Sequence, residues 1–291
     1  MTGEGRKGRS GGVRAAVVLG LIWLTAPIGT RGAPAPASVL ADQLLITWYG
    51  NPRNPRMGVL GEYTGAALAD GLRAQAAAFV RLTPKRVVMA YHLVAVVAQC
   101  TAGVDDRWRR RESASAIRDM LAAARANGFR LVLDVQPGRS TVGDEVAALE
   151  PFLAEPDVYL ALDPEFQVAD CEIPGRTLGH MAGADVNRAL DTLERVIARG
   201  GLPPKVLIVH QFRVDMLPDK PAIRKSALVD VVLNMDGFGS QALKRSSYRA
   251  IMRQGQFPFA GIKVFYQYDD PLLAPADIMA LKPVPSVIIY Q

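Results

Sequence analysis

The sequence lacks the short motifs that mark several common enzyme classes. No Gly-x-Gly-x-x-Gly turn follows the first strand-like segment, which argues against a dinucleotide-binding fold. No Gly-x-Ser-x-Gly occurs in residues 38–291, which argues against serine nucleophilic catalysis. Neither His-x-His nor His-Glu-x-x-His occurs, so any metal ligands would have to come from separate strands.

A membrane-spanning segment is also missing from the sequence. The apolar run from Ala15 to Leu24 is too short to span a bilayer comfortably. Basic residues precede this run, and Ala35-Pro36-Ala37 follows it as a small-residue cleavage site. Residues 1–37 are therefore predicted to be a signal peptide and leader of a secreted or extracytoplasmic bacterial protein. After cleavage no stable membrane insertion is expected, and retention of the segment as an anchor is the alternative.

A strong excess of one charge is absent once the leader is set aside. The chain has 34 basic and 28 acidic residues, and residues 1–37 contain five of the basic and one of the acidic residues. The remainder therefore has a balance of only +2. This balance does not favour nucleic acid as a partner.

The remaining 254 residues, 38–291, contain no Pro/Gly/Ser linker and no low-complexity tract, so a single domain is predicted. Apolar strand-like segments alternate with helical patterns, which is typical of a parallel sheet covered by helices. The eight segments are Leu44 to Gly50, Arg86 to Leu93, Arg130 to Gln136, Val158 to Glu165, Val206 to Phe212, Val229 to Asp236, Gly261 to Gln267 and Ser286 to Gln291. Eight such segments in this length predict an α/β fold of the (β/α)8 TIM-barrel type.

Helical patterns separate most of these segments. They cover Thr64 to Leu82, Ser113 to Asn127, Asp144 to Leu153, Asp185 to Arg199 and Gln241 to Gln254. Asn127-Gly128 and Gly200-Gly201 are typical helix stops. The connections after the fifth and seventh segments are shorter and richer in proline, so no clear helix is predicted there.

The fourth strand-like segment ends in Leu162-Asp163-Pro164-Glu165-Phe166, which brings two carboxyl groups to the end of an apolar strand. Because residues two apart on a strand share a face, Asp163 and Glu165 are expected to point the same way. The other strand-like segments also start apolar and end polar. In a barrel these polar ends converge at the carboxyl-terminal mouth, where barrel enzymes place their chemistry.

Five blocks of sequence resemble a group of secreted bacterial proteins with no established activity. They are Gly58-Val59-Leu60-Gly61-Glu62, the block Leu162 to Phe166, Pro204 to Phe212, Met235-Asp236-Gly237-Phe238-Gly239 and Ile288-Ile289-Tyr290-Gln291. This resemblance implies a (β/α)8 barrel and export rather than a particular reaction.

A more distant likeness links the fourth segment to chitinase-type glycoside hydrolases. Their fourth strand carries Asp-x-x-Asp-x-Asp-x-Glu, in which the Glu is the general acid and the preceding Asp is its partner. Asp163 and Glu165 match the last two positions, whereas Ala161 and Val158 replace the other two aspartates. The resemblance implies acid catalysis by Glu165.

Glycoside cleavage needs a protonated carboxyl at the leaving oxygen and a second carboxylate to stabilise positive charge. We therefore expect Glu165 to be the acid, Asp163 its partner, and Asp134 or Asp236 the second carboxylate, on a polysaccharide or cell-wall glycan. This mechanism requires no cofactor or metal. The residues expected to bind substrate at the mouth are Trp48, Tyr49, Tyr91, His92, Gln136, His210, Gln211, Lys263, Tyr266 and Tyr290.

Two other functions use the same mouth. A metal-dependent hydrolase or isomerase would employ residue types of an O/N metal site, namely His92, His210, Asp134, Asp163, Glu165 and Asp236. A non-catalytic carbohydrate-binding barrel would keep the mouth without the reaction. Metal content, turnover and the effect of Glu165→Gln distinguish the three.

Cysteine is scarce, with two residues in the whole chain. Two cysteines in an exported protein tend to pair, because the compartment is oxidising. Cys100 follows the second strand-like segment and Cys171 the fourth, so both are expected in loops on the mouth side. We therefore predict a disulfide between Cys100 and Cys171.

Overall fold

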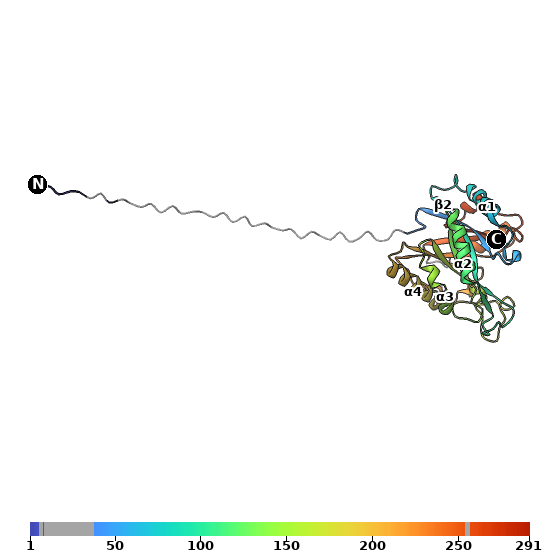
Figure 1. The fold of residues 1–291 in the computed structure, drawn as a ribbon. Coiled ribbons are helices and arrows are strands. Elements are labelled where there is room, and N and C mark those ends of the chain that lie inside the picture. Colours follow the sequence, from blue (N-terminus) through green and yellow to red (C-terminus); the bar gives the residue numbers. More distant parts are fainter. Residues whose placement is uncertain (6–7, 9–37, 254–256) are drawn as a thin grey trace. The chain divides into compact units, whose positions relative to one another are not determined.

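The computed structural model describes residues 1–5, 8, 38–253 and 257–291 (Figure 1). The chain divides into two units, Met1–Pro34 and Ala35–Gln291, and the second unit contains all the helices and strands discussed below. The predicted signal run Ala15 to Leu24 and its cleavage site lie outside the described residues. None of the helices in the described residues is long and apolar enough to cross a membrane.

Eight parallel strands form a closed barrel, as the sequence predicts. Their order around the sheet is β1, β9, β8, β7, β6, β5, β4 and β2, and pairing of β1 with β2 closes the ring. The strands are β1 (Gln43–Gly50), β2 (Arg86–Ala98), β4 (Arg130–Val135), β5 (Val158–Leu162), β6 (Lys205–Gln211), β7 (Val229–Met235), β8 (Phe259–Val264) and β9 (Val287–Tyr290). A short strand, β3 (Arg109–Arg111), adds an antiparallel partner to the far end of β2.

Helices lie between the strands and cover the outside of the barrel (Figure 1). They are α1 (Gly65–Ala77), α2 (Ala114–Ala126), α3 (Val142–Leu153), α4 (Gly183–Gly200), α5 (Gln241–Arg253) and the short α6 (Pro275–Met279). Ser113 and Thr141 cap α2 and α3 by accepting backbone N–H bonds, and Gly201 ends α4 in the left-handed conformation with φ 58°. The five predicted helices are thus confirmed, and the proline-rich connection after β6 forms only 3-10 turns.

Strand residues alternate between two separate apolar cores. One core contains Leu45, Val132, Ile208 and Ile289 and no helix residue, so it fills the inside of the barrel. The other contains their neighbours, such as Leu44, Leu131 and Ile288, together with the buried faces of the helices. This alternation decides which polar residue at each strand end reaches the mouth.

Two strands differ from their predicted lengths in ways that affect the site. Strand β2 continues to Ala98 rather than ending at Leu93, because its far part pairs with both β3 and β4. Strand β5 ends at Leu162 rather than at Glu165, because Pro164 cannot donate a ladder hydrogen bond and instead begins a 3-10 turn, Pro164–Phe166. Glu165 is therefore placed by a turn and not by strand alternation.

Candidate functional site

A cavity of about 360 Å³ opens at the carboxyl-terminal ends of the strands. It is lined by Tyr49, Gln136, Asp163, Glu165, Phe166, Phe212, Asp236, Gly237, Phe238, Leu243, Ser247, Lys263, Phe265 and Gln291. Three of its lining residues are carboxylic acids and one is a lysine, so the cavity combines acidic groups with one cation.

Asp163 and Glu165 both line this cavity, as expected, although they reach it from a strand end and a turn. Burial raises the pKa of the half-buried Glu165 to about 7, and the charge of Asp236 adds to the increase. The pKa of the fully buried Asp163 is also raised, first by burial and then by Glu165. Gln136 Nε2 donates to Asp163 Oδ2 at 3.4 Å. Both acids therefore keep their protons to higher pH than ordinary carboxylic acids do.

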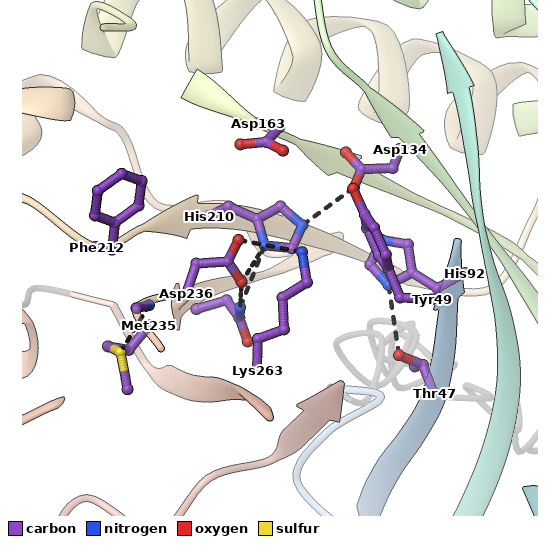
Figure 2. A network of polar contacts seen from close by, with 12 residues as sticks. Thr47, Tyr49, His92, Asp134, Asp163, His210, Phe212, Met235, Asp236 and Lys263 are labelled. Carbon is purple, nitrogen blue, oxygen red and sulfur yellow. Dashed lines mark hydrogen bonds and ion pairs between the residues drawn. The ribbon is translucent and has the colours of Figure 1, made fainter. Parts of the chain in front are cut away.

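Asp236 has the opposite environment. Its Oδ2 lies 3.2 Å from Lys263 Nζ, and its Oδ1 lies 3.2 Å from His210 Nδ1 and accepts from Asn234 Nδ2 at 3.1 Å (Figure 2). Burial alone would raise the pKa of Asp236, but Lys263 and His210 outweigh it and lower the pKa to about 2. Asp236 is therefore ionised at a pH well below the one at which Glu165, in the same cavity, loses its proton.

Beneath the cavity, Asp134 lies between two histidines and is fully buried (Figure 2). Its Oδ2 lies 3.3 Å from His92 Nε2 and 3.3 Å from His210 Nε2. The charges of Asp236 and Asp134 overcome burial and raise the pKa of His210 to about 10. Burial lowers the pKa of His92 to about 4. Asp134 does not line the cavity, so of the two candidates for second carboxylate only Asp236 reaches it.

Five of the predicted substrate-binding residues face away from the mouth. Trp48 packs against Gly71 of α1, where a Cβ would come within 2.2 Å of its ring, and Tyr91 makes an edge contact with Phe129. Tyr266 and Tyr290 stack on each other outside the barrel, with ring centroids 5.4 Å apart. Gln211 binds the backbone of the next loop. The expectation for these five is corrected. Four of them neighbour an inward-facing residue on their strand and so point to the helices, whereas Tyr266 lies in the turn after β8. Tyr49, His92, Gln136, His210 and Lys263 do point into the barrel.

The aromatic lining of the cavity consists mainly of phenylalanines that the sequence analysis missed. They are Phe166, Phe212, Phe238 and Phe265. Each follows an inward polar residue of its strand end by two or three positions, and this spacing is the signal that could have identified them. Phe238 is 59% exposed and contacts Phe265 and the 57% exposed Tyr268.

A buried ion pair fixes the loops that carry Asp236 and Phe238. Lys244 Nζ of α5 lies 2.9 Å from Asp269 Oδ2 and donates to the backbone oxygens of Gly237 and Lys263. Asp269 in turn accepts from the backbone N–H groups of Gly239 and Phe265. We name these two side chains the Lys244–Asp269 clamp. It joins the loop after β7 to the loop after β8.

The predicted disulfide is not present. Cys100 and Cys171 are both free and exposed. Their loops are connected through Arg139 instead, whose Nε donates to the Glu172 carbonyl at 2.8 Å and whose guanidinium carbon lies 4.2 Å from the centroid of the Trp108 ring. Arg139 thus connects the two loops that the predicted disulfide would have joined.

No family model matches the chain, and no curated protein matches it significantly. The fold and the site define the class: a (β/α)8 barrel with acidic and aromatic side chains at its carboxyl-terminal mouth. The reaction must be argued from the site itself.

Proposed function

We propose that this protein is an exported glycoside-hydrolase-like enzyme that acts on a polysaccharide or a cell-wall glycan. The observation that carries the proposal is the contrast between two acids in one cavity. Glu165 has its pKa raised to about 7, whereas Asp236 forms an ion pair with Lys263. Two carboxyl groups whose environments favour opposite protonation states are the requirement for acid-assisted glycoside cleavage.

In this mechanism Glu165 donates its proton to the glycosidic oxygen as the bond from that oxygen to the anomeric carbon breaks. The Asp236 carboxylate stabilises the positive charge that develops at the anomeric carbon, or activates the water that attacks it. Water then adds to the anomeric carbon. Its proton passes to Asp236 if Asp236 activates the water, or to the ionised Glu165 if Asp236 only stabilises the charge. Asp163 is a positioning residue, because its buried carboxyl group lies beside the acid and is held by Gln136.

The aromatic lining supports a carbohydrate as substrate. The apolar faces of sugar rings can pack on aromatic side chains. Phe238 presents an exposed ring in the cavity that holds the acids, and the exposed ring of Tyr268 contacts it. The predicted export signal supports a substrate outside the cytoplasm, such as a polysaccharide or peptidoglycan.

The test is turnover of polysaccharides, peptidoglycan and chromogenic aryl glycosides by the full chain. Glu165→Gln should lower kcat by about 10²- to 10⁴-fold. Glu155→Gln is the matched control, because Glu155 forms an exposed ion pair with Arg125 and should leave the rate unchanged. Turnover that survives Glu165→Gln would refute the proposed acid.

Two further outcomes identify the alternatives. Turnover that requires added divalent metal would indicate a metal-dependent hydrolase or isomerase, and the buried His92, Asp134 and His210 cluster is the observation in its favour. Glycan binding without turnover in both the wild type and Glu165→Gln would indicate a non-catalytic carbohydrate-binding barrel.

A further inference from the structure

The chain contains three histidines, and two of them converge on one aspartate inside the barrel. His92 comes from β2, Asp134 from β4 and His210 from β6, and all three side chains are fully buried. One nitrogen or oxygen of each lies within 4.8 Å of those of the other two. The proposed glycosidase mechanism uses none of these three side chains as a catalytic residue.

The converging atoms lack the hydrogen bonds that such deep burial requires. His92 Nε2, His210 Nε2 and both carboxylate oxygens of Asp134 have no hydrogen-bond partner. An unpaired buried polar atom is costly, and a carboxylate more so than an amide. Asp134 Oδ2 lies near both imidazole nitrogens as an ion-pair partner, but none of these contacts is a hydrogen bond. A ligand bound between the three side chains would satisfy these atoms.

The distances within the cluster fit a metal ion. Asp134 Oδ2 lies 3.3 Å from each imidazole Nε2. Bonds of about 2.0 to 2.1 Å in tetrahedral geometry place neighbouring ligand atoms roughly 3.3 Å apart. The two imidazole nitrogens, which lie within 4.8 Å of each other, are the pair that would adjust to complete the site.

The second nitrogen of each histidine is already held by a neighbour. His210 Nδ1 lies 3.2 Å from Asp236 Oδ1, and His92 Nδ1 lies 3.5 Å from Thr47 Oγ1 (Figure 2). A metal-binding histidine usually donates its other N–H to such a partner, which orients the ring and fixes the tautomer. Both rings are therefore oriented to bind through Nε2.

We infer that His92, Asp134 and His210 form a binding site for a first-row divalent metal ion, of which zinc fits best. Two imidazoles and one carboxylate are ligands that zinc prefers, and a water molecule completes the tetrahedron. This inference does not depend on the proposed glycosidase activity.

The test uses the full chain with Cys100→Ser and Cys171→Ser, without a histidine tag, after removal of metal by a chelator. Zn²⁺ is titrated against a chromogenic chelator, and Co²⁺ binding is followed by visible absorption. One equivalent per chain and a tetrahedral Co²⁺ spectrum are expected. Failure of this protein to bind either ion would overturn the inference.

Variants then assign the ligands. His92→Gln and His210→Gln should each weaken Zn²⁺ binding by at least 100-fold, whereas the matched control His180→Gln should not, because His180 is exposed and outside the cluster. Thr47→Val leaves all three ligands intact and should weaken binding about tenfold. Thr47→Val therefore tests the site even if a histidine variant fails to fold. Unchanged affinity in Thr47→Val and in both folded histidine variants would place the metal elsewhere and refute the site.

Discussion

The side-chain nitrogen of Lys263 lies 3.6 Å from the centroid of the Tyr49 ring. The same nitrogen forms an ion pair with Asp236 at 3.2 Å. A cation over an aromatic face is attracted to it, so Tyr49 and Asp236 together fix the lysine inside the cavity. The charge of Lys263 also acts on Glu165, where it opposes part of the pKa increase that burial and Asp236 cause.

Lys263→Met should lower kcat/KM by about tenfold or more, since Asp236 loses its partner. It should also raise the pKa of Glu165, which moves the alkaline limb of the pH profile to higher pH. Lys263→Arg keeps the charge and is the control. An alkaline limb that stays in place in Lys263→Met would show that the lysine does not act on the catalytic acid.

The pH dependence of the wild type follows from Glu165. A general acid must be protonated, and its pKa of about 7 means that the protonated fraction is lost as pH rises through 7. We expect kcat/KM to fall about tenfold per pH unit above that point. A rate that continues to increase up to pH 9 would contradict the assignment of Glu165 as acid.

Phe238→Ala should raise KM about two- to tenfold, because the ring would bury apolar area against the sugar at about 25 cal/mol per Å². Tyr266→Ala is the matched control, since Tyr266 stacks on Tyr290 outside the cavity and should leave KM unchanged. Initial rates over a range of glycan concentrations give the KM of each variant. Equal effects of the two variants would remove the argument for a sugar-binding ring at Phe238.

Lys244→Met should destabilise the fold by about 3 to 5 kcal/mol, because it leaves the fully buried Asp269 without its cation. Arg245→Met removes the neighbouring surface ion pair with Asp277 and should cost less than about 1 kcal/mol. Urea denaturation measures the free energy of unfolding. The double variant Lys244→Met and Asp269→Leu should recover part of the loss, and no recovery would mean that the lysine stabilises through packing alone.

The barrel could be predicted from the sequence because its strands are continuous apolar runs and its helices end at Asn127-Gly128 and Gly200-Gly201. The carboxyl groups of Asp163, Glu165 and Asp236 were also found, since polar residues at strand ends meet at the mouth. Glu165 lies at the mouth as predicted, but strand alternation does not place it there. Alternation on a strand was expected, but Pro164 ends the strand and a turn places the side chain.

The aromatic residues were the main failure, and the reason is physical. Strand ends such as Trp48-Tyr49 and Tyr91-His92 each have one residue inside the barrel and one outside, and residue type alone does not tell which is which. The prediction of a disulfide was wrong for another reason. The packing of the two loops depends on contacts such as those of Arg139, which the sequence does not reveal.

The Lys244–Asp269 clamp couples the opening of the two loops that it joins. The loops after β7 and β8 share one buried charge pair and its backbone hydrogen bonds, so neither can open without breaking the same contacts. Amide hydrogens of Gly239 and Phe265 should therefore show the same free energy of opening in hydrogen exchange. We expect the two loops that carry Asp236 and Phe238 to open as one cooperative unit, so a ligand that binds either loop should protect both.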